Sequence, residues 1–96
     1  MDRLLSLYER MKKLRESGVR MKDISEETDI ASSVLSSLYS SVLPMYVNLV
    51  SGGEEQEAAL DKALQQVNNV SKRKLLGCLD TLYDKVNHIE PRQASN

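Results

Sequence analysis

Serine hydroxyls and basic side chains are the groups in this chain whose types and spacing could do chemistry, and both gather in its first half. Serines recur between residues 31 and 43, a stretch without any charged side chain, and they include Ser32, Ser33, Ser36 and Ser37. Such short hydroxyls could bond to bases or phosphates, or they could simply form a smooth polar surface that packs closely. Serine reads bases with little selectivity, and a neutral hydroxyl releases no counterions. The serines alone therefore leave both interpretations open.

Charge is distributed unevenly along the same half. Residues 1–22 hold seven basic and three acidic side chains, whereas residues 23–43 hold four acidic and no basic ones. The whole chain has a formal net charge of −1, which argues against a strongly cationic nucleic-acid-binding protein. A phosphate-bearing partner would therefore have to meet the first segment while the four acids point away.

Catalytic and metal-binding patterns are missing from the sequence. Cys78 is the only cysteine and His88 the only histidine, so neither an internal disulfide nor a metal-ligand cluster has the residues it needs. We expect Cys78 to be a partly buried structural thiol and His88 a surface residue near a helix end. No Gly-rich phosphate loop or Ser, His and Asp set is recognisable. The sequence predicts a protein that is not an enzyme and that needs no cofactor or metal.

Length and hydropathy predict one soluble domain. With 96 residues, few glycines and prolines, and neither Phe nor Trp, the chain suits a small all-α fold with an aliphatic core. No window holds the roughly 18 to 20 consecutive apolar residues of a membrane span, and the first residues lack a signal-peptide core. We therefore expect a cytoplasmic protein that does not interact with a membrane.

Three short helices are expected in residues 1–43. Ser17 and Gly18 end the first helix, and Asp29 begins a polar break after the second, so that Ser32 or Ser33 could cap the third. Within each helix the residues expected to face inward recur at intervals of three or four; they are Leu7, Met11 and Leu14, then Ile24 and Thr28, then Leu35, Leu38 and Val42. A short second helix joined by a tight turn to a third is the layout of a helix-turn-helix.

The segment KKLRESGVRMKDISEETDIASSVLSSL resembles the phage-repressor or xenobiotic-response-element family of helix-turn-helix proteins. The resemblance covers about residues 7–40, where a basic first helix ends in Leu-Arg-Glu and is followed by Gly, an aliphatic residue and a helix with paired small and apolar residues. Asp29 stands where the family usually has Gly in the turn, and Asp tolerates the left-handed backbone better than most residues. Ser25 stands where the family prefers Ala, and it is also small.

The resemblance implies a transcriptional regulator that binds double-stranded DNA, with its third helix in the major groove. Arg20 and Lys22 would hold phosphates at the start of the second helix, and Lys12 and Lys13 would be further phosphate contacts. The residues that would face the groove are Ala31, Ser32, Ser33, Ser36 and Ser37. Because serines supply a weak base code, sequence-specific binding would need a homodimer. The alternative is a helical protein-interaction or assembly module that does not bind DNA, which the near-neutral charge favours.

The second half of the chain predicts a connection, a helical hairpin and a tail. Pro44 is expected to start a new segment, so that residues 44–53 connect the first part to a hairpin over residues 54–89. The last helix carries apolar residues at heptad spacing: Leu75, Leu79, Leu82, Val86 and Ile89. This seam either packs against the preceding helix or joins two copies of the chain. Residues 90–96 are expected to be a flexible tail, which completes a single domain of about five helices over residues 1–96.

Overall fold

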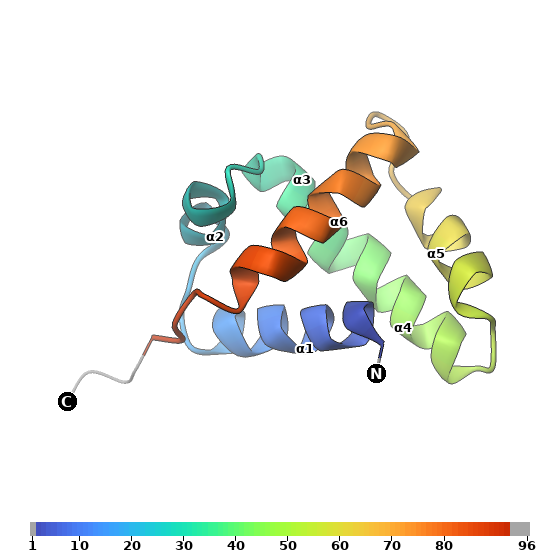
Figure 1. Cartoon of the computed structure of the whole chain (residues 1–96), viewed down its shortest axis with the longest axis horizontal. Coiled ribbons are helices and arrows are strands. Elements are labelled where there is room, and N and C mark those ends of the chain that lie inside the picture. The colour runs from blue at the N-terminus through green and yellow to red at the C-terminus, as the bar shows by residue number, and fades with distance from the viewer. Residues whose placement is uncertain (1, 93–96) are drawn as a thin grey trace.

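The computed structural model describes residues 2–92, which fold into helices joined by short connections (Figure 1). There are five helical stretches in this range and no strand, which confirms the small all-α domain. Three are single helices in the first and last parts of the chain, namely α1 (Arg3–Glu16), α2 (Met21–Thr28) and α6 (Lys72–Val86). Between them lie α5 (Gln56–Leu64) and one continuous stretch made of α3 (Ser32–Ser37), η1 (Leu38–Val42) and α4 (Leu43–Ser51).

The core has the inward faces that the periodicity predicts. Side chains from α1, α2, α3 and η1 lie in it at 7% exposure or less, and they include all eight predicted inward positions: Leu7, Met11, Leu14, Ile24, Thr28, Leu35, Leu38 and Val42. Gly18, with φ +99°, follows the end of α1 as expected. The spacing of these residues therefore predicts correctly which face of each of the first three helices lies in the core.

Pro44 does not begin a new segment, contrary to the sequence-based prediction. The helix runs through it because the preceding turn widens to a π-helix, in which the backbone N–H of Leu43 donates to the carbonyl of Leu38. In a regular α-helix the proline ring clashes with the carbonyl four residues earlier, and a wider turn makes room for it. The break falls instead at Gly52 and Gly53, where Gly53 has φ +99°.

By length and composition alone, one helix of the described range, Ser32–Ser51, could cross a membrane. In this fold the stretch packs on α1, α2 and α5 through buried residues that include Leu35, Leu38 and Tyr46, and 28% of its apolar window is buried. Packing inside the domain thus accounts for part of its apolar character. The absence of a membrane interaction and the cytoplasmic location stay predictions.

The last two helices diverge, which corrects the expected hairpin over residues 54–89. Helix α5 packs on α4, whereas α6 runs away from α5 and packs on α1 and α2 (Figure 1). Ser71 caps α6 as predicted, because its side chain accepts a hydrogen bond from the backbone N–H of Lys74. Helix α6 therefore begins where the sequence predicts, but it packs on α1 and α2 and not on the preceding helix.

The heptad seam of α6 lies inside the monomer. Its five residues are exposed by 8% or less: Leu75, Leu79, Leu82, Val86 and Ile89. These side chains face helices of the same chain, so the seam contributes to the core and leaves no free apolar stripe. A homodimer stays a prediction, and it would have to use another surface of the folded chain.

The described end of the chain returns to α1. Arg10 donates from Nη2 to the carbonyl of Ile89 at 2.6 Å, and the backbone N–H of Arg92 donates to Oγ of Ser17 at 3.0 Å. The Arg10 guanidinium thus lies just beyond the end of α6, where a helix favours positive charge. Residues 90–92 of the predicted tail therefore have a defined place, and residues 93–96 lie outside the described range.

Candidate nucleic-acid interface

Helices α2 and α3 pack against each other across a three-residue connection, residues 29–31. Asp29 ends α2 in the left-handed conformation, with φ 61° and ψ 26°, as the comparison with glycine in the family led us to expect. Ile30 in the connection is buried. The order of elements and the tight turn are those of a helix-turn-helix.

Side-chain hydroxyls of α2 satisfy the backbone around this turn. Thr28 donates from Oγ1 to the carbonyl of Ile24 at 2.7 Å and accepts from the backbone N–H of Ile30 at 3.4 Å. Ser25 donates from Oγ to the carbonyl of Ile30 at 2.5 Å. A buried connection would otherwise leave polar backbone groups unpaired, so these bonds fix how α3 leaves α2.

The outer surface of α3 consists of short, neutral side chains. Of the predicted groove-facing residues, Ser37 is half-buried and the other four are exposed: Ala31, Ser32, Ser33 and Ser36. Ala31 is the N-cap residue and no side chain caps the helix, so the prediction of a cap from Ser32 or Ser33 is wrong. Within residues 2–92 no hydrogen bond engages the hydroxyls of Ser32, Ser33 and Ser36, and they stay available to an outside partner.

Three basic residues, Arg20, Lys22 and Arg92, form what we call the basic corner at the start of α2. Arg20 is the N-cap residue, and its Nη2 lies 3.4 Å from Oδ1 of Asp23. Arg92 approaches the same carboxylate from the end of the chain, with Nη2 3.6 Å from Oδ2. Lys22 is exposed in the first turn and makes no ion pair with any described residue. Two cations, those of Arg20 and Arg92, therefore flank one carboxylate, and Lys22 adds a third, unpaired cation in the same helical turn.

Asp23 holds the basic corner in place. Its Oδ2 accepts from the backbone N–H of Arg20 at 2.9 Å. This bond, followed by the bond from the Arg20 guanidinium, lowers the pKa of Asp23 below its ordinary value. The carboxylate is thus charged at neutral pH, and it orients both arginines while cancelling part of their charge.

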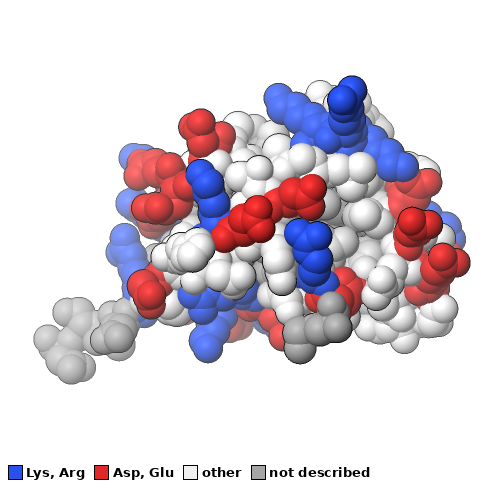
Figure 2. All heavy atoms as spheres, viewed as in Figure 1, with Lys and Arg blue, Asp and Glu red and all other residues white. Residues whose placement is uncertain are grey.

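The remaining charged residues near α2 and α3 lie outside the basic corner. Lys12 and Lys13 are exposed on α1, and no contact joins them to the basic corner within the described range. Glu26, Glu27 and Asp29 are exposed on the second half of α2 and in the turn. Figure 2 shows basic and acidic groups mixed over the α2 end of the molecule, with a separate basic patch where α6 begins. The acids would have to lie away from a bound phosphate backbone.

Arg92 is a candidate residue that the sequence pattern did not indicate. It lies in a segment expected to be flexible, and only the return of the chain past Ser17 brings it to α2. The basic patch at α6 was also missed, although three consecutive cations mark it: Lys72, Arg73 and Lys74. Both omissions concern residues far in sequence from the recognised motif.

No protein-family model, curated protein or solved structure matches this chain. Among residues 2–92, no group of three or more His, Cys, Asp or Glu side chains could hold a metal ion. Cys78 is half-buried and His88 is exposed near the end of α6, as expected. Function therefore has to be inferred from the residues of the chain itself.

Proposed function

We propose that the chain is a DNA-binding helix-turn-helix protein that regulates transcription and inserts α3 into the major groove. The observation that carries the proposal is the exposed, neutral surface of α3 directly after a tight turn, with the basic corner at the start of the preceding helix. In proteins of this kind the first helix of the pair crosses the DNA backbone and the second reads base edges. Helices α2 and α3 would thus offer cations to phosphates and short side chains to bases.

Phosphate contacts would supply most of the affinity. Arg20, Lys22 and Arg92 can meet phosphate oxygens beside the backbone amides that open α2, where a helix favours negative charge. Ser32, Ser33 and Ser36 can bond to base edges but discriminate poorly among them, and the methyl group of Ala31 can contact thymine. A single copy should therefore bind DNA with little sequence preference, and two copies on paired half-sites would add selectivity.

The salt dependence of DNA binding tests this proposal. Fluorescence anisotropy with a mixed-sequence duplex should show that Arg20→Ala, Lys22→Ala and Arg92→Ala together weaken binding. Because each phosphate contact contributes about 0.9 to the slope of log affinity against log salt, the slope should fall by about two to three. Each variant is first checked for helix content and thermal midpoint, so that lost binding is not lost folding.

A matched control removes the same charge from the patch at the start of α6, with Lys72→Ala, Arg73→Ala and Lys74→Ala. This control should retain more of the wild-type salt slope than the variant of the basic corner. Two results would contradict the proposed interface. One is an unchanged salt slope in the variant of the basic corner, and the other is a decrease of the slope in the control that is as large or larger.

A protein-interaction or assembly module is the second candidate function. The observation that favours it is the absence of charge over residues 30–53, which deprives α3 of any cation. Such a neutral surface is well suited to close packing against another protein. If the folded chain does not bind duplex DNA even at low salt, this second function replaces the first.

A further inference from the structure

A groove of about 860 Å³ opens where α5 and α6 diverge. Its apolar lining comes from four helices, and no residue of α2 or α3 takes part; the lining includes Leu4, Tyr46, Leu60, Leu76, Leu79 and Tyr83. Tyr46 is buried, and its hydroxyl donates to Oδ2 of Asp2 at 2.5 Å, which fixes one end of the groove. Leu60 and Leu76 are half-buried, so part of the apolar lining faces solvent.

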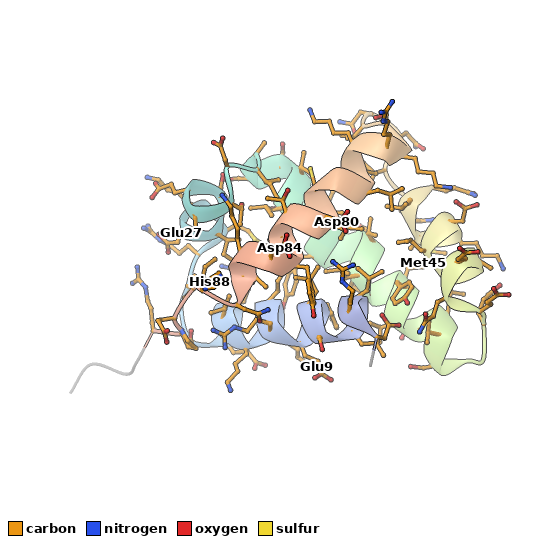
Figure 3. The ribbon with its side chains drawn as sticks, viewed as in Figure 1. Glu9, Glu27, Met45, Asp80, Asp84 and His88 are labelled. Carbon is orange, nitrogen blue, oxygen red and sulfur yellow. The ribbon has the colours of Figure 1, made fainter. Side chains whose placement is uncertain are left out.

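The polar rim of the groove carries more acid than base. Three carboxylates line it, from Asp2, Glu57 and Asp80, against the single guanidinium of Arg3. Asp80 lies on α6 together with Asp84, one turn further along, on the face turned to the viewer in Figure 3. Both aspartates are exposed. The rim therefore favours a cationic partner.

Arg3 shows how a cation fits this rim. Its guanidinium carbon lies 4.5 Å from the centre of the Tyr83 ring, and Nη2 lies 3.6 Å from Oδ1 of Asp80. The Arg3 side chain is 59% exposed, and an ion pair this exposed contributes little to stability. A cation from another molecule can displace Arg3 at small cost and use the same ring and carboxylate.

We propose that this groove binds an amphipathic helix of a partner protein, with leucine-like side chains on one face and Lys or Arg beside them. A helix that lays its apolar face into a groove is a common mode of peptide recognition. The leucines of the lining select the apolar face, and the excess of carboxylates on the rim selects the positive charge. This docking function is separate from DNA binding because the two surfaces share no residue.

Peptide selection on the folded full-length chain tests the proposal. A displayed library of random peptides is selected on the wild-type chain and counter-selected on Leu76→Lys, which places a cation in the groove. We expect enriched peptides with apolar residues at helical spacing and a net positive charge. Enriched acidic peptides, peptides that bind Leu76→Lys equally well, or no enrichment would overturn the proposal.

The affinity of one enriched, synthesised peptide for variants of the groove then tests which residues bind it. Leu76→Lys should weaken its binding at least tenfold, and Glu57→Gln with Asp80→Asn should weaken it several-fold. Leu49→Lys is the matched control, because Leu49 is also a half-buried leucine but does not line the groove. The charge variants keep the test valid if Leu76→Lys does not fold, since unchanged affinity in them would also overturn the proposal.

DNA binding is measured on the same variants and should not change. The two proposed functions are thus tested independently, and either one can be disproved without the other.

Discussion

Two pairs of consecutive helices in this domain pack in opposite ways. Helices α2 and α3 are joined by residues 29–31 and lie against each other, whereas α5 and α6 are joined by residues 65–71 and diverge around a groove. In the first connection Ile30 is buried and its backbone is hydrogen-bonded by side chains of α2. In the second, Val67 and Val70 are only half-buried. A short connection that is itself part of the core keeps sequence neighbours together in space.

The two pairs also offer opposite surfaces to a partner. The first presents short neutral side chains on α3 and cations at the start of α2, while the second presents leucines and carboxylates. A polyanion suits the first surface, and a cationic amphipathic segment suits the second.

Substituting the centre of the α6 seam should have the largest effect. Leu82 is fully buried, so Leu82→Lys places an ammonium group without a partner in the core. Because this costs several kcal/mol, about the whole stability of a small domain, we expect loss of folding in circular dichroism. Leu76→Lys, at a half-buried position of the same helix, should remain folded. If the wild type is a dimer in light scattering, a Leu82→Lys chain that stays folded and becomes monomeric would instead show that the seam joins two copies.

Shortening the side chain in the tight turn should have the next largest effect. Ile30→Ala leaves a cavity under the turn, and we expect a loss of about 2–4 kcal/mol in the free energy of unfolding by urea. Val70→Ala, in the connection between α5 and α6, should cost under about 1 kcal/mol because Val70 is half-buried. Equal losses of unfolding free energy in the two variants would contradict the conclusion that the first connection is part of the core and the second is not.

Replacing Asp29 should give a smaller effect of the opposite sign. Asp29→Gly removes the strain of a left-handed backbone, so the free energy of unfolding should rise by about 0.5–1 kcal/mol. The same change removes an exposed acid beside α3 and should strengthen DNA binding at low salt. A lower thermal midpoint would show that the Asp29 side chain stabilises the turn.

Acid should weaken the basic corner, with the smallest effect on stability. The folded pKa of Asp23 is lowered, so its contribution is complete above the unfolded pKa of about 4 and is lost as pH falls through the folded value. Wild type should therefore exceed Asp23→Asn in thermal midpoint at pH 6, and the difference should shrink below pH 4. Glu26→Gln removes one negative charge from an exposed position of the same helix and is the matched control for the loss of charge alone. A constant difference for Asp23→Asn would argue against the hydrogen bonds by which Arg20 lowers the pKa of this carboxyl.

Local patterns in the sequence predict most of the helices but not how the later ones pack. The inward faces of Leu7, Met11 and Leu14 follow from spacing alone because a helix repeats every 3.6 residues. The uninterrupted helix through Pro44 depends on a π-turn, which no simple pattern signals. The divergence of α5 and α6 and the approach of Arg92 to Asp23 arise from tertiary packing between distant segments. The predicted interface therefore gains Arg92, and the groove was not foreseen.

The central claim is that the surface of α2 and α3 contacts DNA, and nuclear magnetic resonance tests it most directly. Amide chemical shifts of the labelled chain would be recorded at low salt with and without a mixed-sequence duplex. We predict salt-sensitive changes at residues 20–22, 31–36 and 92, with little change at residues 56–60 of α5. An absence of shift changes, or changes confined to residues 72–74, would contradict the proposed interface.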